Sequence, residues 1–263
     1  MIKQRHVAAL LAEFIGTATL ALVVLSVLSS QLGLPFFVAM AAGVTLAVFA
    51  NVFGNVSGVH FNPAITFGLF VIRQISALRA VGYIVVQVLG GFVAWQLYER
   101  LAGNTLDNRS ASEVDWKILG AEFIGALVFG AVVAAVVTQK VKGHQAAFGV
   151  GGGLFIGILI ASLGSGAILN PAVAVAMRSL DVNYFTGPVL GALTGMLLVA
   201  LFIVPVFNPV KKLKKKSVGS DAPKVVEESP TVVSEVKKPV AKKPVAKKPA
   251  TKKATVKKKT TKK

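Results

Sequence analysis

The sequence predicts an all-α membrane protein with six transmembrane helices and two half-helices arranged as an inverted repeat, followed by a disordered C-terminal tail. Three observations favour this class. The chain of 263 residues is 54% hydrophobic with a mean hydropathy of +0.69. Apolar runs close to the ~20 residues that cross a bilayer recur through residue 207. One long segment also occurs twice, and each copy holds the tripeptide Asn-Pro-Ala within an apolar stretch.

The apolar runs define six predicted spans. Before residue 208 there are 17 charged residues, and most of them fall between the runs. The first run is too long for the apolar region of a cleavable signal peptide, so we interpret it as a permanent span. The spans are expected at about 7–29, 35–54, 79–99, 117–138, 147–166 and 185–207.

Two half-helices are predicted at about 63–72 and 171–179, directly after Asn62 and Asn170. Each begins with proline, which suits the first helical position because a backbone N–H would lack a partner there. Asparagine is a favoured residue for the preceding cap position. Half-helices that enter from opposite faces would point their positive ends at each other in mid-membrane, an arrangement that describes a pore.

The repeat is visible as Leu-Ala-Glu-Phe-Ile-Gly at 11–16 and Gly-Ala-Glu-Phe-Ile-Gly at 120–125. The glutamate precedes the asparagine of the same copy by 49 residues in the first half and by 48 in the second. Each half holds three spans, an odd number, so the second copy is inverted. We therefore expect repeat halves at about 7–100 and 117–207 within a channel domain of residues 1–207.

Basic residues in alternate short connections predict the orientation. One set of connections carries only basic residues, whereas the 101–116 connection carries three acidic residues and one arginine. We predict a multi-pass protein of the cell membrane with both termini in the cytoplasm. The basic set consists of Lys3, Arg5, Arg73, Arg79, Lys140 and Lys142.

The tail, residues 208–263, has a different composition. Its last 53 residues hold 19 lysines and four acidic residues, so they supply +15 of the formal net charge of +18. Such a segment cannot bury a core and is expected to be disordered. We expect it to lie near anionic lipid headgroups. Attraction to nucleic acid is a less favoured alternative.

The chain offers no chemistry typical of an enzyme. It has no cysteine, and its three histidines, His6, His60 and His144, have no partner at a metal-ligand spacing. We expect no metal, no cofactor and no catalytic residues. Trp95, Tyr98, Trp116 and Tyr184 lie near predicted span ends and are interpreted as anchors at the membrane interface.

The segment Ser-Gly-Val-His-Phe-Asn-Pro-Ala-Ile-Thr at 57–66 resembles the first signature of the aquaporin, or major intrinsic protein, family. The second motif (Asn170, Pro171, Ala172), the two Ala-Glu-Phe-Ile-Gly segments and Gln87 match this family too. The resemblance covers about residues 1–207. It implies an aquaporin-like fold and a homotetramer in which each subunit has its own pore for water or small neutral solutes.

Polar residues within the apolar segments are expected to build the pore. The side-chain oxygens of Asn62 and Asn170 would cap the half-helices and leave the amide N–H groups aimed into the pore. Glu13 and Glu122 are costly in a membrane unless partnered, and their repeat positions and the resemblance indicate that they accept backbone N–H groups of the loops before the half-helices. A proton relay is the alternative. His60 is expected to order its loop, with gating by protonation as the alternative. The resemblance implies that Gln87 also supports the loop.

The outer filter is where this sequence departs from the family it resembles. Most members continue the second motif with arginine, but this chain has Val173. Counting from the asparagines, the other filter positions fall on Ala42, Ile158 and Ala167, none aromatic or charged. We predict a wide, apolar outer filter that passes water and small neutral solutes. Another loop side chain could instead refill the site. Ala174 replaces an aspartate usual in glycerol facilitators, which argues against an ordinary glycerol channel.

Two other functional classes are alternatives to a passive pore. A secondary transporter can also use inverted repeats and broken helices. It would need a charged group for a substrate or coupling ion at the midplane, and the two Asn-Pro-Ala motifs offer only neutral residues. A structural membrane protein with a vestigial pore is the second alternative, which fast water flux would exclude.

Overall fold

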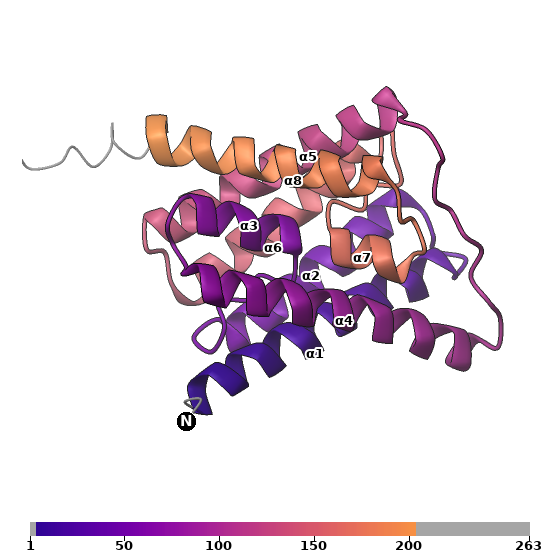
Figure 1. Cartoon of the computed structure of the whole chain (residues 1–263), viewed down its shortest axis with the longest axis horizontal. Helices are drawn as coiled ribbons and strands as arrows, with labels where there is room; N and C mark the ends of the chain where they lie inside the picture. The colour runs from indigo at the N-terminus through magenta and orange to yellow at the C-terminus, as the bar shows by residue number, and fades with distance from the viewer. Residues whose placement is uncertain (1–3, 204–263) are drawn as a thin grey trace, which may run out of the picture. The chain divides into compact units, whose positions relative to one another are not determined.

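The computed structural model describes residues 4–203, so the predicted tail lies outside the described residues. Figure 1 shows these residues as a bundle of long helices around two short ones. Six helices are long and apolar enough to cross a membrane, α8 together with the π-helical turn after it counting as one. The elements are α1 (Gln4–Leu28), α2 (Pro35–Phe53), α3 (Pro63–Val71), α4 (Ala77–Ala102), α5 (Trp116–Thr138), α6 (Gly143–Ala161), α7 (Pro171–Ala176), α8 (Val182–Leu198) and the π-helical turn Val199–Ile203.

The six predicted spans and two half-helices are confirmed, with shifts at their ends. The fifth span begins at Gly143 and ends at Ala161, four to five residues earlier than predicted, because the chain must then turn back into the bundle to reach α7. The second half-helix ends at Ala176, not at residue 179. Its helix stops because Arg178, two residues later, adopts a left-handed backbone with φ of 55°.

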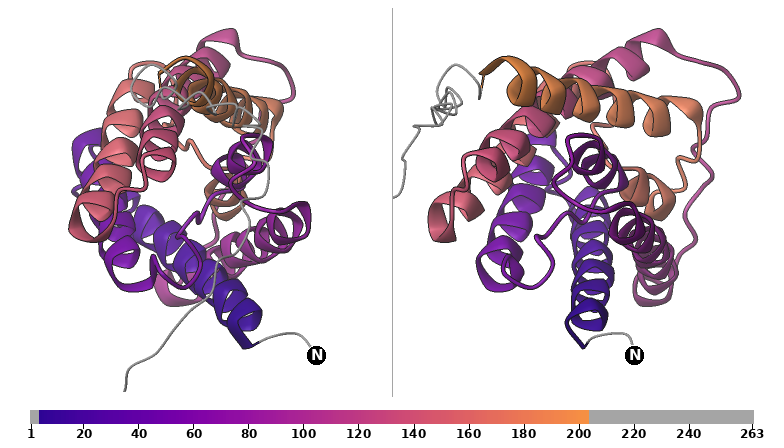
Figure 2. Two further views of the ribbon diagram at one scale, coloured as in Figure 1. Left: turned by 90° about the vertical axis from the view of Figure 1, so that its left-hand side faces the viewer. Right: turned by 60° about the vertical axis from the view of Figure 1, so that its left-hand side comes forward.

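The backbone repeats the internal symmetry of the sequence. Left-handed residues occur at matching places in the two halves, at Val59, Phe61 and Arg73 in the first and at Ala167, Leu169 and Arg178 in the second. Helix α1 packs on α4, and α5 packs on α8, so the first and last long helices of each half pack on each other. Each half-helix then packs on the last long helix of the other half, α3 on α8 and α7 on α4. Figure 2 shows the long helices surrounding the chain segments that lead into α3 and α7.

Close backbone approach fixes the second half-helix in place. A Cβ atom on Gly91 of α4 would overlap the carbonyl oxygen of Ala172, in the first turn of α7. On the other side of the bundle, a Cβ atom on Gly191 of α8 would overlap the carbonyl oxygen of Phe123 in α5. Small residues at such crossings let helix backbones touch. In a bilayer there is no hydrophobic driving force between helices, and this close packing makes them associate.

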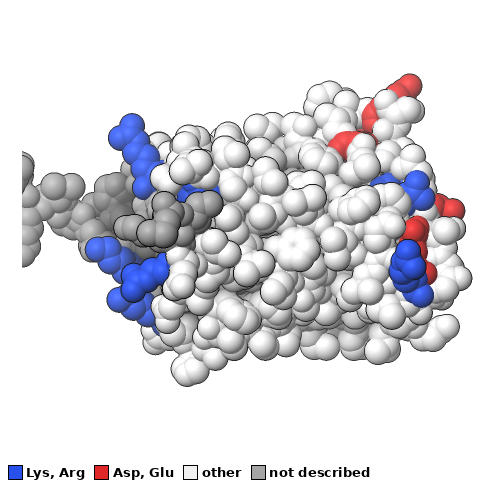
Figure 3. All heavy atoms as spheres, turned by 60° about the horizontal axis from the view of Figure 1, so that its bottom comes forward, with Lys and Arg blue, Asp and Glu red and all other residues white. Residues whose placement is uncertain are grey.

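Charged residues lie at the two ends of the bundle. Figure 3 shows a broad uncharged band between an end that carries only Lys and Arg and an end that carries Asp and Glu with Lys and Arg. We call the first the basic end; it includes the 72–76 and 139–142 connections. We call the second the loop end; it includes the long 103–115 connection and the 177–181 connection. The apolar band between them has the character of a surface that faces lipid.

Candidate functional site

Two buried carboxylates support the irregular loops that precede the half-helices. In the first half, Glu13 accepts hydrogen bonds from the backbone N–H groups of His60 at 3.0 Å and Phe61 at 2.8 Å. In the second half, Glu122 accepts from Ile168 at 2.9 Å and Leu169 at 2.7 Å. Both glutamates are fully buried. They satisfy backbone donors that neither lipid nor a helix can satisfy.

The two loops differ in what surrounds the carboxylate. In the first half, Gln87 donates to Glu13 at 2.8 Å and to Thr66 at 2.9 Å, and Thr66 also lies 3.1 Å from Nδ1 of His60. In the second half, the hydroxyl of Ser165 donates to Glu122 at 2.7 Å. His60 therefore belongs to a buried polar network that orders the loop before α3. Thr66 closes the 57–66 signature and Ser165 lies outside the motifs, and nothing in the sequence marks either hydroxyl as a partner of this network.

The two asparagines cap the half-helices and also join the two halves. The Oδ1 atom of Asn62 accepts from the N–H of Ala64 at 2.8 Å, and that of Asn170 accepts from Ala172 at 3.0 Å. Each Nδ2 atom crosses to the other half, Asn62 donating to the carbonyl of Leu169 and Asn170 to that of Phe61, both at 2.8 Å. An amide has two N–H donors. Among the residues described, no hydrogen bond is found for the second donor of either asparagine.

Three cavities follow one another between the two ends of the bundle. The basic-end vestibule has a volume of about 530 Å³ and reaches Leu46 of α2. The constriction, of about 20 Å³, includes Ala42 one turn along the same helix. The loop-end vestibule has a volume of about 340 Å³ and shares Met177 with the constriction. The three cavities therefore lie in series, with Asn170 lining the middle one.

The four residues predicted for the outer filter lie together around the constriction. Ala42, Ile158, Ala167 and Val173 all line it. The rest of its wall includes Leu20, Val24, Val38, Leu154 and Met177, so the lining is mostly apolar. A volume near 20 Å³ holds about one water molecule. Beside the small side chains at 42 and 167, α1 and Met177 supply apolar side chains that counting from the asparagines does not include.

The basic-end vestibule carries a positive charge. Arg79, Lys140 and Lys142 line it, together with His60 and Ser57. No Asp or Glu lines it among the residues described. The positive field at this end disfavours cations at the entrance.

The prediction that the aromatic residues near the span ends are interfacial anchors is wrong for Tyr98. Trp116 is 77% exposed, as an interfacial anchor would be. Tyr98, in contrast, is buried and hydrogen-bonded to the hydroxyl of Ser29. The hydroxyl of Tyr184 accepts from the backbone N–H of Gly166 at 3.1 Å, and Trp95 lies beneath the guanidinium of Arg178 at 4.9 Å. At the loop end these three side chains thus contact the Ser29 hydroxyl, the backbone of Gly166 and the guanidinium of Arg178.

No group of histidine, cysteine or carboxylate side chains that could hold a metal ion occurs within residues 4–203. The site is therefore a polar, uncharged pair of asparagines between two vestibules. Such an arrangement can bind and orient a small neutral molecule.

Known proteins resemble this chain in sequence and in fold. The Major intrinsic protein family profile matches residues 2–199. The chain is 33% identical to aquaporin-1 of Sus scrofa over 182 residues, which cover 64% of this chain and 67% of the pig protein. Aquaporin-1 of Rattus norvegicus is 30% identical over 182 residues, covering 64% of this chain and 68% of the rat protein.

Among solved structures, the chain matches the X-ray structure of the aquaglyceroporin from Plasmodium falciparum with a TM-score of 0.64. The match covers 78% of this chain and 99% of that chain, at 20% sequence identity. At this identity the likeness supports the fold and not the choice of solute.

Proposed function

Because the chain belongs to the major intrinsic protein family, a family of membrane channels and not of enzymes, we propose that it is a passive channel for water and other small neutral solutes. The observation that carries this proposal is the pair of crossed asparagines, Asn62 and Asn170, which bring the two half-helix N-termini together between two vestibules. The pig and rat relatives are named aquaporin, which favours water as a solute.

Water would pass the asparagines in single file. A water oxygen at this level can accept from the second N–H of Asn62 and of Asn170, and this turns its own hydrogens away from the two amides. Neighbouring waters on either side then point in opposite directions, so a continuous hydrogen-bonded wire for protons is broken at the asparagines. The N-termini of α3 and α7 add partial positive charge at the same level and raise the cost of a cation there.

The apolar constriction sets which solutes cross. Without a guanidinium at position 173, solutes lose hydrogen-bond donors at this level, and larger neutral solutes lose a steric and electrostatic barrier. At about 20 Å³ the constriction holds one water. Passage of a larger solute would require side chains such as Met177 to move.

Three further parts of the proposal concern the setting of the channel. The basic end would face the cytoplasm of the cell membrane, since basic connections are retained on that side. The channel would be a homotetramer, as the family resemblance implies. The lysine-rich residues 208–263 would bind anionic lipid headgroups.

The first test is osmotic swelling of proteoliposomes. We expect vesicles with the protein to swell faster than empty vesicles, with a lower activation energy, because water crosses a preformed path. Stopped-flow light scattering over a range of temperatures measures both quantities. A permeability equal to that of empty vesicles, with folded protein demonstrated in the same vesicles, would show that the chain is not a water channel.

A second prediction concerns the filter. Val173→Arg should reduce the flux of glycerol, urea and hydrogen peroxide more than the flux of water, because a guanidinium narrows the constriction and adds donors that favour water. The same stopped-flow assay with each solute measures the ratio. Val182→Arg serves as the control, since Val182 is exposed and lines none of the three cavities. If the wild type excludes all three solutes while passing water fast, the filter is not permissive.

A further inference from the structure

The 103–115 connection is held across the loop end by hydrogen bonds to the backbone just after the second half-helix. The carbonyl of Arg178 accepts from the N–H of Arg109 at 2.9 Å and from the hydroxyl of Ser110 at 3.4 Å. The hydroxyl of Ser110 in turn accepts from the N–H of Leu180 at 2.7 Å. These bonds fix the backbone of Arg109 beside the end of α7.

Side chains from α8 and its cap hold the rest of the same connection. Asp181 accepts from the N–H of Ala111 at 3.0 Å, and Asn183 accepts from the N–H of Asp115 at 3.0 Å. Both side chains are buried, Asn183 completely. The backbone of the connection is therefore tied at several points along its length.

Arg178, the next arginine along the chain after the second Asn-Pro-Ala motif, is already engaged. The guanidinium of Arg178 lies 4.9 Å from the ring centroid of Trp95, and its Nη1 donates to the carbonyl of Leu106. Both contacts hold it on the flank of α4, and it lines neither the constriction nor the loop-end vestibule. The guanidinium of Arg178 thus binds the 103–115 connection and lines neither cavity of the solute pathway.

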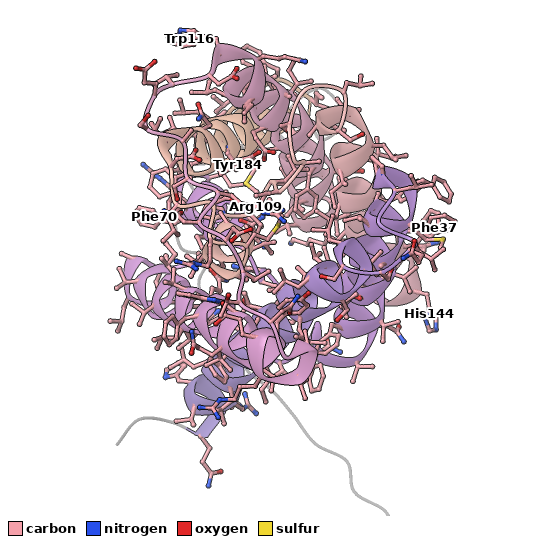
Figure 4. All side chains as sticks on the ribbon, turned by 90° about the vertical axis from the view of Figure 1, so that its right-hand side faces the viewer. Phe37, Phe70, Arg109, Trp116, His144 and Tyr184 are labelled. Atoms are coloured by element: carbon pink, nitrogen blue, oxygen red, sulfur yellow. The ribbon has the colours of Figure 1, made fainter. Side chains whose placement is uncertain are left out.

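Arg109 has a different place. It lines the loop-end vestibule, where the other charged residue is Asp107. Its side chain is exposed, and Figure 4, which looks onto the loop end, places Arg109 near the middle of the ring of helices, whereas Trp116 and His144 lie at the rim. Met177 lies between this vestibule and the constriction, so the charge stands directly before the narrowest part of the path.

We propose that Arg109 is a specificity-determining residue. Its guanidinium supplies a permanent positive charge in the loop-end vestibule, which a solute meets before it reaches the constriction. This proposal rests on the proposed function. An arginine stays charged at any pH a cell meets. Placed in a vestibule bounded by low-dielectric walls, it repels cations before they reach the constriction and favours neutral solutes over them. Asp107 lines the same vestibule and offsets part of this charge.

The absence of cysteine from the chain allows a direct measurement of this charge. Met177→Cys introduces one thiol between the vestibule and the constriction. Its rate of modification is measured in proteoliposomes with an anionic reagent, sulfonatoethyl methanethiosulfonate, and with a cationic one, trimethylammonioethyl methanethiosulfonate. Each rate is normalised to that of a free thiol in solution. The ratio of the anionic to the cationic rate reports the local potential, and it requires no water flux.

We expect Arg109→Gln to lower this ratio about three- to tenfold, because it removes one positive charge from the vestibule that position 177 also lines. Asp107→Asn should raise it. Arg100→Gln is the matched control, because Arg100 is an exposed arginine in the last turn of α4 that does not line the vestibule. It should leave the ratio within about twofold at moderate ionic strength, where exposed distant charges are screened.

A second reporter, Leu25→Cys, lines the same vestibule from α1 and is used if the Met177 variant does not fold. A ratio that is unchanged in Arg109→Gln, or changed equally in Arg100→Gln, overturns the proposal. So does a thiol that reacts with neither reagent, since Arg109 would then face no open path. Swelling of wild-type vesicles is measured in parallel. Slow swelling with a ratio that depends on Arg109 would reject the proposed water function and keep the assignment of the charge.

Discussion

Glu122→Gln is expected to destabilise the folded channel by about 3–5 kcal/mol, a large part of the 5–15 kcal/mol typical of a folded protein. The carboxylate accepts from two backbone N–H groups and from the hydroxyl of Ser165. An amide keeps one acceptor oxygen and turns an NH2 group toward a donor. One buried backbone N–H then faces another donor, and neither lipid nor water can replace the lost bond.

The measurement is thermal unfolding of the purified protein in detergent, followed by water permeability of proteoliposomes reconstituted from it. We expect a much lower unfolding temperature and little water flux. Glu113→Gln is the surface control, because Glu113 is exposed at the loop end. A Glu122→Gln protein as stable as wild type would contradict the prediction. It would indicate that position 122 carries a neutral carboxyl group, which glutamine can imitate.

Glu13→Gln should cost about as much as Glu122→Gln, because Glu13 occupies the same place in the repeat. Glu13 also accepts from two backbone N–H groups, and its third donor, the amide of Gln87, can turn as the hydroxyl of Ser165 can in the second half. An amide at position 13 leaves one of the two backbone N–H groups without an acceptor. We therefore expect similar losses of unfolding temperature for the two variants in the same experiment, and a clearly smaller loss for Glu13→Gln would contradict this prediction.

Local rules made most of the fold predictable from the sequence. The lengths of the apolar runs located the six spans, because a bilayer fixes how long a spanning helix must be. The cap and the first turn of each half-helix were predictable because asparagine and proline have strong preferences at these two positions. The end of α7 was not predictable, since it depends on the left-handed backbone at Arg178 and on the connection that binds there.

The surroundings of the site were harder to predict than its motifs. The place of Tyr98 in the sequence predicts an interfacial anchor, yet Tyr98 is buried and bonds to Ser29, which is distant in the chain. The constriction likewise includes Leu20 and Val24 of α1, which no motif marks. Contacts of this kind follow from how helices cross, and a single sequence does not specify the crossings.

Asn62→Asp is expected to make the channel leak cations. Aspartate caps a helix as well as asparagine does, so α3 should keep its start and the protein its fold. The change removes the donor to the carbonyl of Leu169, at a cost of about 1 kcal/mol, and places a negative charge beside the two half-helix N-termini. A unit negative charge attracts a monovalent cation ~4 Å away by roughly 4 kcal/mol at an effective dielectric constant of about 20. Water in the path reduces this value, so we expect a cation leak about 10- to 100-fold above that of wild type.

Dissipation of a potassium or proton gradient across proteoliposomes, at matched amounts of folded protein, measures the leak. Asn170→Asp should behave alike, because its amide makes the reciprocal bond to the carbonyl of Phe61. Asn51→Asp is the control, since it adds the same charge at an exposed position that lines the basic-end vestibule. If Asn62→Asp passes water but leaks no more than Asn51→Asp, charge at the capping asparagines does not control cation exclusion. The barrier would then lie in the vestibules, where Arg79 and Arg109 stand at opposite ends of the path.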